Sequence, residues 1–292
     1  MTDDHLFERR LHKARDEMRT IAHKAGLRSK ADALAALIEP AVRLVPSREP
    51  ASLIGATKIG GQPELPAGFA WPQFEEKPLS FVAQIALIDV AGLPGTATLP
   101  TRGLLSFFFD STQQAWGFDP AQRDGFRVFY FPSATPLHSV ALPAELPDDA
   151  RFRALSLRPK LEVSWPAWAC ADVERLLDQN ELRAYLDALP EVEEPPQQHQ
   201  LLGHPAPVQG DMQVEAQLVS HGLYCGDLSG YKDPRATKLR TGATDWRLLL
   251  QIDSDEDAGM MWGDAGRIYF WSRRADLAAR KFDAAHAILQ CG

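Results

Sequence analysis

The chain has 292 residues, of which 45% are hydrophobic and 24% are charged, a composition typical of a globular protein with a sizeable core. Its formal net charge is −8 and no basic stripe is visible, so we expect a basic protein partner and no nucleic-acid partner. The N-terminal residues lack an apolar run of signal-peptide length, and runs such as 103–109 are too short to span a bilayer. We therefore expect a cytoplasmic protein that does not enter a membrane.

Two helices are predicted at the start of the chain. Residues 4–25 carry apolar positions at helical spacing and are followed by Gly26, a residue typical of helix ends. A second, short helix is predicted over 30–39, before Pro40. The basic stretch 9–15 has acidic neighbours and is interpreted as a solvated helix face. Residues 1–40 are thus predicted to form an N-terminal helical extension.

The pattern changes after residue 40 to short apolar runs rich in β-branched and aromatic residues, punctuated by Gly and Pro, which predict strands. These runs are 41–45, 79–87, 103–109 and 127–131, and later 246–252 and 267–271. Between the two groups, 171–189 predicts a helix and the acidic, proline-bearing 190–198 predicts a loop or linker. Residues 274–290 predict a closing C-terminal helix.

Three blocks of sequence occur twice in the same order, which indicates an internal duplication. The first block contains Gly-x-Pro, the second an apolar strand with Gln-Ile, and the third a Gly before an aromatic strand. The matched positions are Gly61 with Gly203, Pro63 with Pro205, Gln84 with Gln251, and Gly103 with Gly266. We predict an α+β fold with a duplicated, mostly antiparallel β core, N-terminal helices and a C-terminal helix. Within a domain spanning 41–292, the two pseudo-twofold related halves are 41–166 and 199–292, joined by a helix and linker over 167–198.

Gln84 and Gln251 are polar residues inside apolar strands, and each needs hydrogen-bond partners if it is buried. One interpretation is that both side chains fasten backbone at equivalent places in the two halves. The other is that they contact a ligand near the pseudo-axis.

Seven segments spread over most of the chain share one further pattern, namely 57–72, 78–87, 102–110, 199–212, 248–255, 260–271 and the terminal 290–291. Together they resemble the YwqG-like family of uncharacterised bacterial proteins. The family has no established activity, so the resemblance implies a fold but no reaction. One departure is Ala86, where the resemblance implies an Asn, and this puts a polar role at that position in doubt.

The acidic segment 253–264 contains Asp253, Asp255, Asp257 and Asp264 at spacings similar to those of a calcium loop. However, Ala258 occupies the position where such a loop requires Gly, and strands rather than helices are predicted on both sides. We interpret the segment as a solvated acidic hairpin loop and expect no tight calcium binding. A different oxygen-rich cation site is the alternative.

Two features of the "WGDAG" turn (262–266) bear on function. Asp264 is predicted to cap the turn through backbone N–H groups, and Trp262 is either a core residue or an exposed anchor for a partner. No catalytic signature accompanies this turn. His199 and His204 are interpreted as turn-region residues, and Cys170, Cys225 and Cys291 as reduced, structural thiols, so we expect no cofactor.

We hypothesise a non-enzymatic protein-binding module, such as an immunity-like protein that neutralises a basic toxin. The alternative is a small-molecule or cation-dependent enzyme with its site in the cleft between the halves. The binding surface is predicted where the loops 57–72 and 253–264 meet, a place where Lys58 and Asp264 can pair across the crevice. The alternative is that the two loops lie at opposite ends of the fold and each only closes its own hairpin. The candidate binding residues are Lys58, Gln62, Trp71, Gln84, Gln251, Trp262, Asp264 and Arg267. The oligomeric state stays open.

Overall fold

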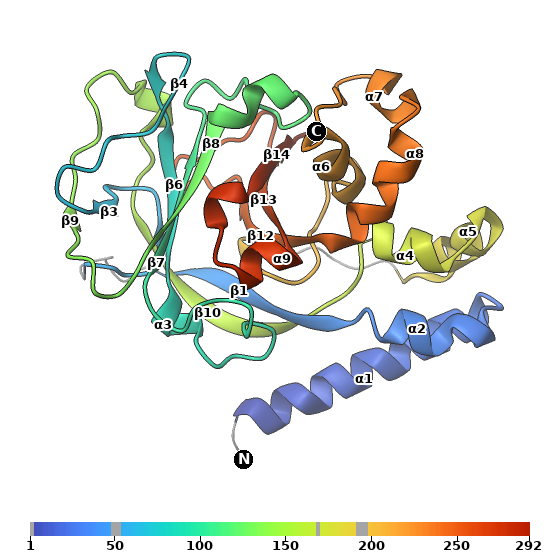
Figure 1. Cartoon of the computed structure of the whole chain (residues 1–292). Helices are drawn as coiled ribbons and strands as arrows, with labels where there is room; N and C mark the ends of the chain where they lie inside the picture. Colours follow the sequence, from blue (N-terminus) through green and yellow to red (C-terminus); the bar gives the residue numbers. More distant parts are fainter. Residues whose placement is uncertain (1–2, 48–53, 168–169, 191–197) are drawn as a thin grey trace.

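A ten-stranded antiparallel sheet forms the centre of the computed structural model, which describes residues 3–47, 54–167, 170–190 and 198–292 (Figure 1). The order of its strands is β14-β13-β12-β11-β1-β10-β2-β6-β7-β8. Their bounds are β1 (Glu39–Ser47), β2 (Lys58–Ile59), β6 (Ser80–Ala86), β7 (Leu104–Phe109), β8 (Phe126–Phe131), β10 (Leu155–Ser164), β11 (Gln200–Leu201), β12 (Trp246–Asp253), β13 (Arg267–Arg273) and β14 (His286–Gln290). Two small ladders lie outside this sheet, formed by β3 (Glu64–Leu65) with β9 (His138–Ser139) and β4 (Gln73–Phe74) with β5 (Lys77–Pro78).

Helices are short apart from the first. They are α1 (Asp3–Lys24), α2 (Ala31–Ala35), α3 (Leu87–Val90), α4 (Ala171–Leu176), α5 (Gln179–Ala188), α6 (Gln213–Val219), α7 (Leu228–Lys232), α8 (Ala236–Leu239) and α9 (Arg274–Ala278). Short stretches of 3-10 helix lie at η1 (Arg28–Lys30), η2 (Pro120–Gly125), η3 (Asp148–Ala150), η4 (Arg240–Asp245) and η5 (Phe282–Ala284). Within the described residues, no helix combines the length and the apolar character that a membrane crossing needs.

The sheet curls until its two ends approach each other across an apolar core. The Phe107 ring of β7 packs edge-on against Phe270 of β13, with their centroids 5.1 Å apart. At the outer edge of β14, the N–H of Leu289 donates to the carbonyl of Trp116 at 3.0 Å. The segment after β7 therefore covers an edge strand that would otherwise expose unpaired backbone groups.

The predicted N-terminal helices form, and the apolar stripe of α1 is buried against α2, α5 and β10. In Figure 1, α1 lies along the outside of the sheet, close to α2. The second helix is shorter than predicted, because it ends at Ala35 and the chain enters β1 at Glu39. The predicted loop over 190–198 lies almost entirely outside the described residues.

The predicted C-terminal helix over 274–290 is wrong. Only α9 (Arg274–Ala278) is helical; η5 follows it, and 286–290 form the edge strand β14, paired with β13. The five residues of β14 are all buried, so the strand lacks the alternation of apolar and polar residues that identifies a half-exposed strand. The predicted helix over 171–189 is also interrupted, because Asp178 starts α5 as its N-cap.

Candidate functional site

Gln84 and Gln251 are completely buried and fasten backbone in the same way. The Gln84 amide donates to the carbonyl of Ala56 at 2.8 Å and accepts from the N–H of Glu64 at 3.3 Å. The Gln251 amide donates to the carbonyl of Gln198 at 2.6 Å and accepts from the N–H of Ala206 at 2.9 Å. Both side chains thus hold the loop that follows the neighbouring two-residue strand, which agrees with the first of the two interpretations.

The predicted ion pair between Lys58 and Asp264 does not form. Lys58 is buried and forms an ion pair with Glu64 at 2.6 Å, and it also donates to the carbonyl of Gln62 at 2.7 Å. This pair lies inside the loop that Gln84 fastens, so its charge is compensated without the second half of the chain. Of the other candidates in this loop, Gln62 is exposed, and Trp71 donates to the carbonyl of Leu79 at 2.9 Å.

The acidic segment 253–264 is only partly a solvated loop, because two of its carboxylates are buried. Asp253 forms an ion pair with Arg267 at 3.0 Å and accepts from the N–H of Gln198 at 2.9 Å. Since the partners of this carboxylate come from separate stretches of chain, the segment is fixed at its base. We call residues 253–264 the acidic hairpin loop below.

The second buried carboxylate, Asp255, faces His199. The N–H of Asp253 donates to Nδ1 of His199, so the proton of the neutral ring lies on Nε2, which donates to Asp255 at 3.3 Å. This hydrogen bond holds the pKa of Asp255 below its usual range. Asp255 also accepts from the N–H of Ala258 at 2.9 Å and closes the turn of the loop. His199 therefore positions the loop and is more than a turn-region residue.

The acidic hairpin loop is tied to the first half by Arg153 and Gln113. The Arg153 guanidinium donates to the carbonyls of Asp257 at 2.7 Å and of Glu256, and its N–H donates to the carbonyl of Ala258 at 2.8 Å. The Gln113 side chain bonds Met261 and Gly263 at 2.9 Å each.

The residue before Arg153 contacts the other loop, because the N–H of Gly61 donates to the carbonyl of Phe152 at 2.9 Å. Loops 57–72 and 253–264 therefore approach the same segment, 152–153. The two loops are therefore connected through residues 152–153 and not through the predicted ion pair.

Trp262 is a core residue, as the first interpretation held, and the alternative of an exposed anchor is wrong. Its ring packs between Phe109 and Phe152, at centroid distances of 6.1 and 5.2 Å, and its indole N–H donates to the carbonyl of Asp253. The predicted cap by Asp264 is also wrong, because the turn is closed by the N–H of Gly266, which donates to the carbonyl of Trp262 at 2.7 Å.

The tip of the acidic hairpin loop faces solvent. Met261 is 48% exposed, and the three acidic residues around the turn, Glu256, Asp257 and Asp264, are exposed as well. Across the described ranges, no three His, Cys, Asp or Glu side chains are grouped so that they hold a metal ion. The chemistry that the tip offers is a cluster of negative charge around one exposed thioether.

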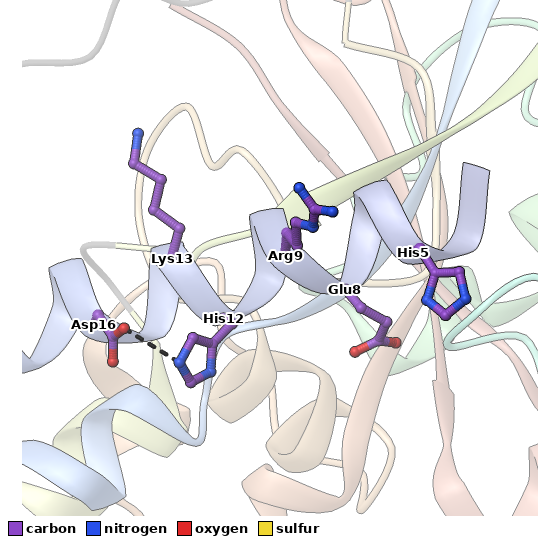
Figure 2. A pocket seen from close by; sticks show the side chains of 6 residues that line it. All are labelled: His5, Glu8, Arg9, His12, Lys13 and Asp16. Atoms are coloured by element: carbon purple, nitrogen blue, oxygen red, sulfur yellow. Dashed lines mark ion pairs between the residues drawn. The ribbon is translucent and has the colours of Figure 1, made fainter. Parts of the chain in front are cut away.

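The mixed-charge face of α1 borders a depression on the surface, and Figure 2 shows its six lining side chains, which all come from that one helix. His12 and Asp16 form an exposed ion pair at 3.4 Å. Since the opposite face of α1 supplies the apolar contacts, this is the solvated face that stretch 9–15 predicted. The three cysteines are buried and free, in line with structural thiols.

Comparison with known proteins identifies the domain but not its activity. A family model described as a domain of unknown function, DUF1963, matches residues 57–291. The chain belongs to the DUF1963 family. No curated protein matches it. The matched stretch of the DUF1963 domain begins after β1, although β1 lies between β10 and β11 in the sheet.

Proposed function

We propose that the protein is a non-enzymatic binding protein that recognises a basic protein partner through the exposed tip of the acidic hairpin loop. The observation that carries this proposal is the contrast between the tip and its base. Glu256, Asp257 and Asp264 are exposed, whereas Asp253 and Asp255 below them are buried and bonded. The negative charge at the tip is therefore presented on a fixed support.

A fixed loop favours association because little conformational entropy remains to be lost on binding. The exposed carboxylates steer a basic partner and increase its association rate. Met261 adds an adaptable apolar contact at the centre of this charge. Burying Asp253 and Asp255 costs free energy that a loop serving only as a connection does not need to expend.

The test is quantitative capture of proteins from a native lysate with the wild type and with a variant of the tip. The variant carries Glu256→Gln, Asp257→Asn, Met261→Ala and Asp264→Asn, which leaves the buried base intact. A matched control carries Glu75→Gln, Glu76→Gln, Glu145→Gln and Leu228→Ala, all at exposed positions.

We expect a basic protein that binds the wild type and the control, is lost with the tip variant, and binds less at high salt. A partner that is retained by the tip variant contradicts the proposal. The immunity-like form of the proposal also requires that this partner be toxic to cells when it is expressed without the chain.

We further propose that the β core arose by duplication. The support is a matched set of contacts on either side of the central pair β1–β10. Outward from it, each side has a two-residue strand and then three longer strands, and the first of these carries the Gln. The turns after the two-residue strands both contain two consecutive residues with positive φ, Gly60–Gly61 and Leu202–Gly203.

We also propose that this member of the DUF1963 family is a bacterial, YwqG-like protein that works in the cytoplasm. The segments that resemble the YwqG-like family support the first statement. Three buried, unpaired thiols support the second, because oxidising compartments favour disulfides. Fractionation of cells that produce the chain at native levels tests the location.

A further inference from the structure

A cleft of about 370 Å³ opens between η2 of the first half and the end of the sheet in the second half. Its walls come from η2, the end of α6, the start of β12, the junction of β13 with α9, and β14. A volume of this size is in the range of small-molecule sites. The acidic hairpin loop contributes no residue to it, so the cleft is independent of the function proposed above.

Two arginines, Arg123 and Arg273, line this cleft, and Arg273 is the one that lies against an aromatic ring of its wall. Its guanidinium lies 4.9 Å from the centre of the Trp246 ring and donates to the hydroxyl of Ser220 at 2.9 Å. The Trp246 indole N–H is itself held by Gln217, whose side-chain oxygen accepts from it at 2.9 Å and lies 3.4 Å from Arg273. The side chain is thus fixed by stacking and hydrogen bonding before any ligand arrives.

Arg273 has no carboxylate partner within ion-pair distance in the part of the chain that the structure describes. Both hydrogen bonds to neutral groups use the same nitrogen, Nη2, which leaves donors on Nε and Nη1. A half-buried guanidinium with free donors on the wall of a cavity is suited to a planar oxyanion, which it binds in a bidentate manner.

The remaining lining restricts the charge and shape of a ligand. Asp119 and Asp276 also line the cleft and offset the charges of Arg123 and Arg273, so the cleft favours a monoanion over a dianion such as a phosphate monoester. Pro120, Val219 and Ala284 supply apolar surface beside them. We propose that the cleft binds a small organic monocarboxylate, with its carboxylate on Arg273 and its apolar body against Pro120, Val219 and Ala284.

The test uses benzoate as the probe, with benzylamine and inorganic phosphate as comparisons. Binding is followed by 19F NMR of protein labelled with fluorotryptophan, in which Trp246 is assigned through Trp246→Phe. We expect benzoate to shift the Trp246 signal in a saturable manner at millimolar concentration. Benzylamine has the same apolar body and the opposite charge, and it should leave the signal unchanged. Phosphate should bind more weakly than benzoate.

Variants then distinguish a direct contact with Arg273 from a nonspecific effect of positive charge. Arg273→Met should weaken benzoate binding about tenfold or more, because the bidentate contact is lost. Arg274→Met removes the same charge at the next, exposed residue and should change the affinity less than about twofold. Asp276→Asn should tighten binding, because one repulsive carboxylate is removed.

Absence of saturable benzoate binding to the wild type overturns the proposal, as does binding that Arg273→Met leaves unchanged. If Arg273→Met does not fold, Arg273→Lys and Asp276→Asn decide the question. The lysine keeps the charge but not the planar fork and should still weaken binding, whereas the asparagine should strengthen it. Tighter binding by Arg273→Lys, or weaker binding by Asp276→Asn, contradicts the carboxylate site.

Discussion

The buried histidine His286 shows how a single residue couples the fold to pH. Its Nε2 donates to the carbonyl of Gly117 at 2.9 Å, and burial lowers its pKa from 6.5 to about 4. The unfolded chain therefore takes up a proton at a higher pH than the folded chain. The stabilisation from the neutral ring is complete above about pH 6.5 and is lost as the pH falls towards 4.

His286→Gln should flatten this part of the stability profile. The amide of Gln can still donate to the carbonyl of Gly117, but it does not titrate. Between pH 7 and 4, the free energy of unfolding of the wild type should fall by up to about 3 kcal/mol more than that of the variant. Urea unfolding at several pH values measures this difference, and His138→Gln at an exposed site is the control. Parallel profiles for wild type and His286→Gln contradict the prediction.

Two buried carboxyl groups change the stability in the opposite direction over the same pH range. Burial raises the pKa of Asp211 to about 6 and that of Glu215 to about 7, so their folded forms hold protons that the unfolded chain releases. Their contribution to stability falls as pH rises. The comparison of His286→Gln with the wild type removes this background, because both proteins contain the two carboxyls.

At the scale of single residues, the sequence predicted the positions of the two Gln side chains, because a polar residue repeated inside an apolar strand needs internal partners. It did not predict that Asp253 and Asp255 are buried. Arg267 faces Asp253 directly across the hairpin, but His199, the partner of Asp255, lies in a separate stretch of chain, and Arg153, which holds the loop from the first half, lies about a hundred residues away. Such contacts depend on tertiary placement, and no local pattern reports them.

Strands formed by uninterrupted apolar, β-branched or aromatic runs were predicted well, whereas β10 and β14 were not. β6, β7, β8, β12 and β13 all lie where apolar, β-branched or aromatic runs predicted them. β10 was missed because Pro159 and three charged residues interrupt it, although it is one of the two central strands. β14 was assigned to a helix because it follows an Ala-rich stretch and contains a single β-branched residue, Ile288.

The contact between the segment after β7 and β14 gives a prediction at the scale of elements. Gly117 has a φ of +97°, and a Cβ there would lie 2.2 Å from the carbonyl oxygen of Ala287. Gly117→Ala should therefore push the segment off β14 and lower the free energy of unfolding by about 2 kcal/mol or more.

The matched control is Gly68→Ala, at a φ of +71°, where an added Cβ would meet no other part of the described chain within 4 Å. It carries the backbone strain without the close approach and should cost about 1 kcal/mol. Equal losses for the two variants, measured by urea unfolding, contradict a special role for the contact at Gly117.

At the scale of the whole molecule, the sheet is arranged evenly about β1 and β10. If the halves are related by duplication, the two Gln side chains carry equal weight. Gln84→Leu and Gln251→Leu should each lower the free energy of unfolding by about 1–3 kcal/mol, because each leaves a buried backbone N–H and carbonyl without the partner they had. The two losses should agree within about 1 kcal/mol.

Urea unfolding of the two variants measures these losses, and Gln73→Leu at an exposed position is the control, with an expected change below about 0.5 kcal/mol. A large loss for one Gln and almost none for the other contradicts equivalent roles.

The position of β1 at the middle of the sheet also determines when the central strands can pair during synthesis on the ribosome. β1 leaves the ribosome early, whereas β10, its antiparallel partner, is made about a hundred residues later. At a synthesis rate of about 5–20 residues per second, β1 remains unpaired with β10 for about 5–20 s, and Val42 and Leu44 stay exposed during that time. The apolar face of α1 stays exposed for longer, because α5, which packs against it, is synthesised after β10. The nascent chain therefore has to be shielded from aggregation during most of its synthesis, and its central strand pair forms only after the first half has been translated.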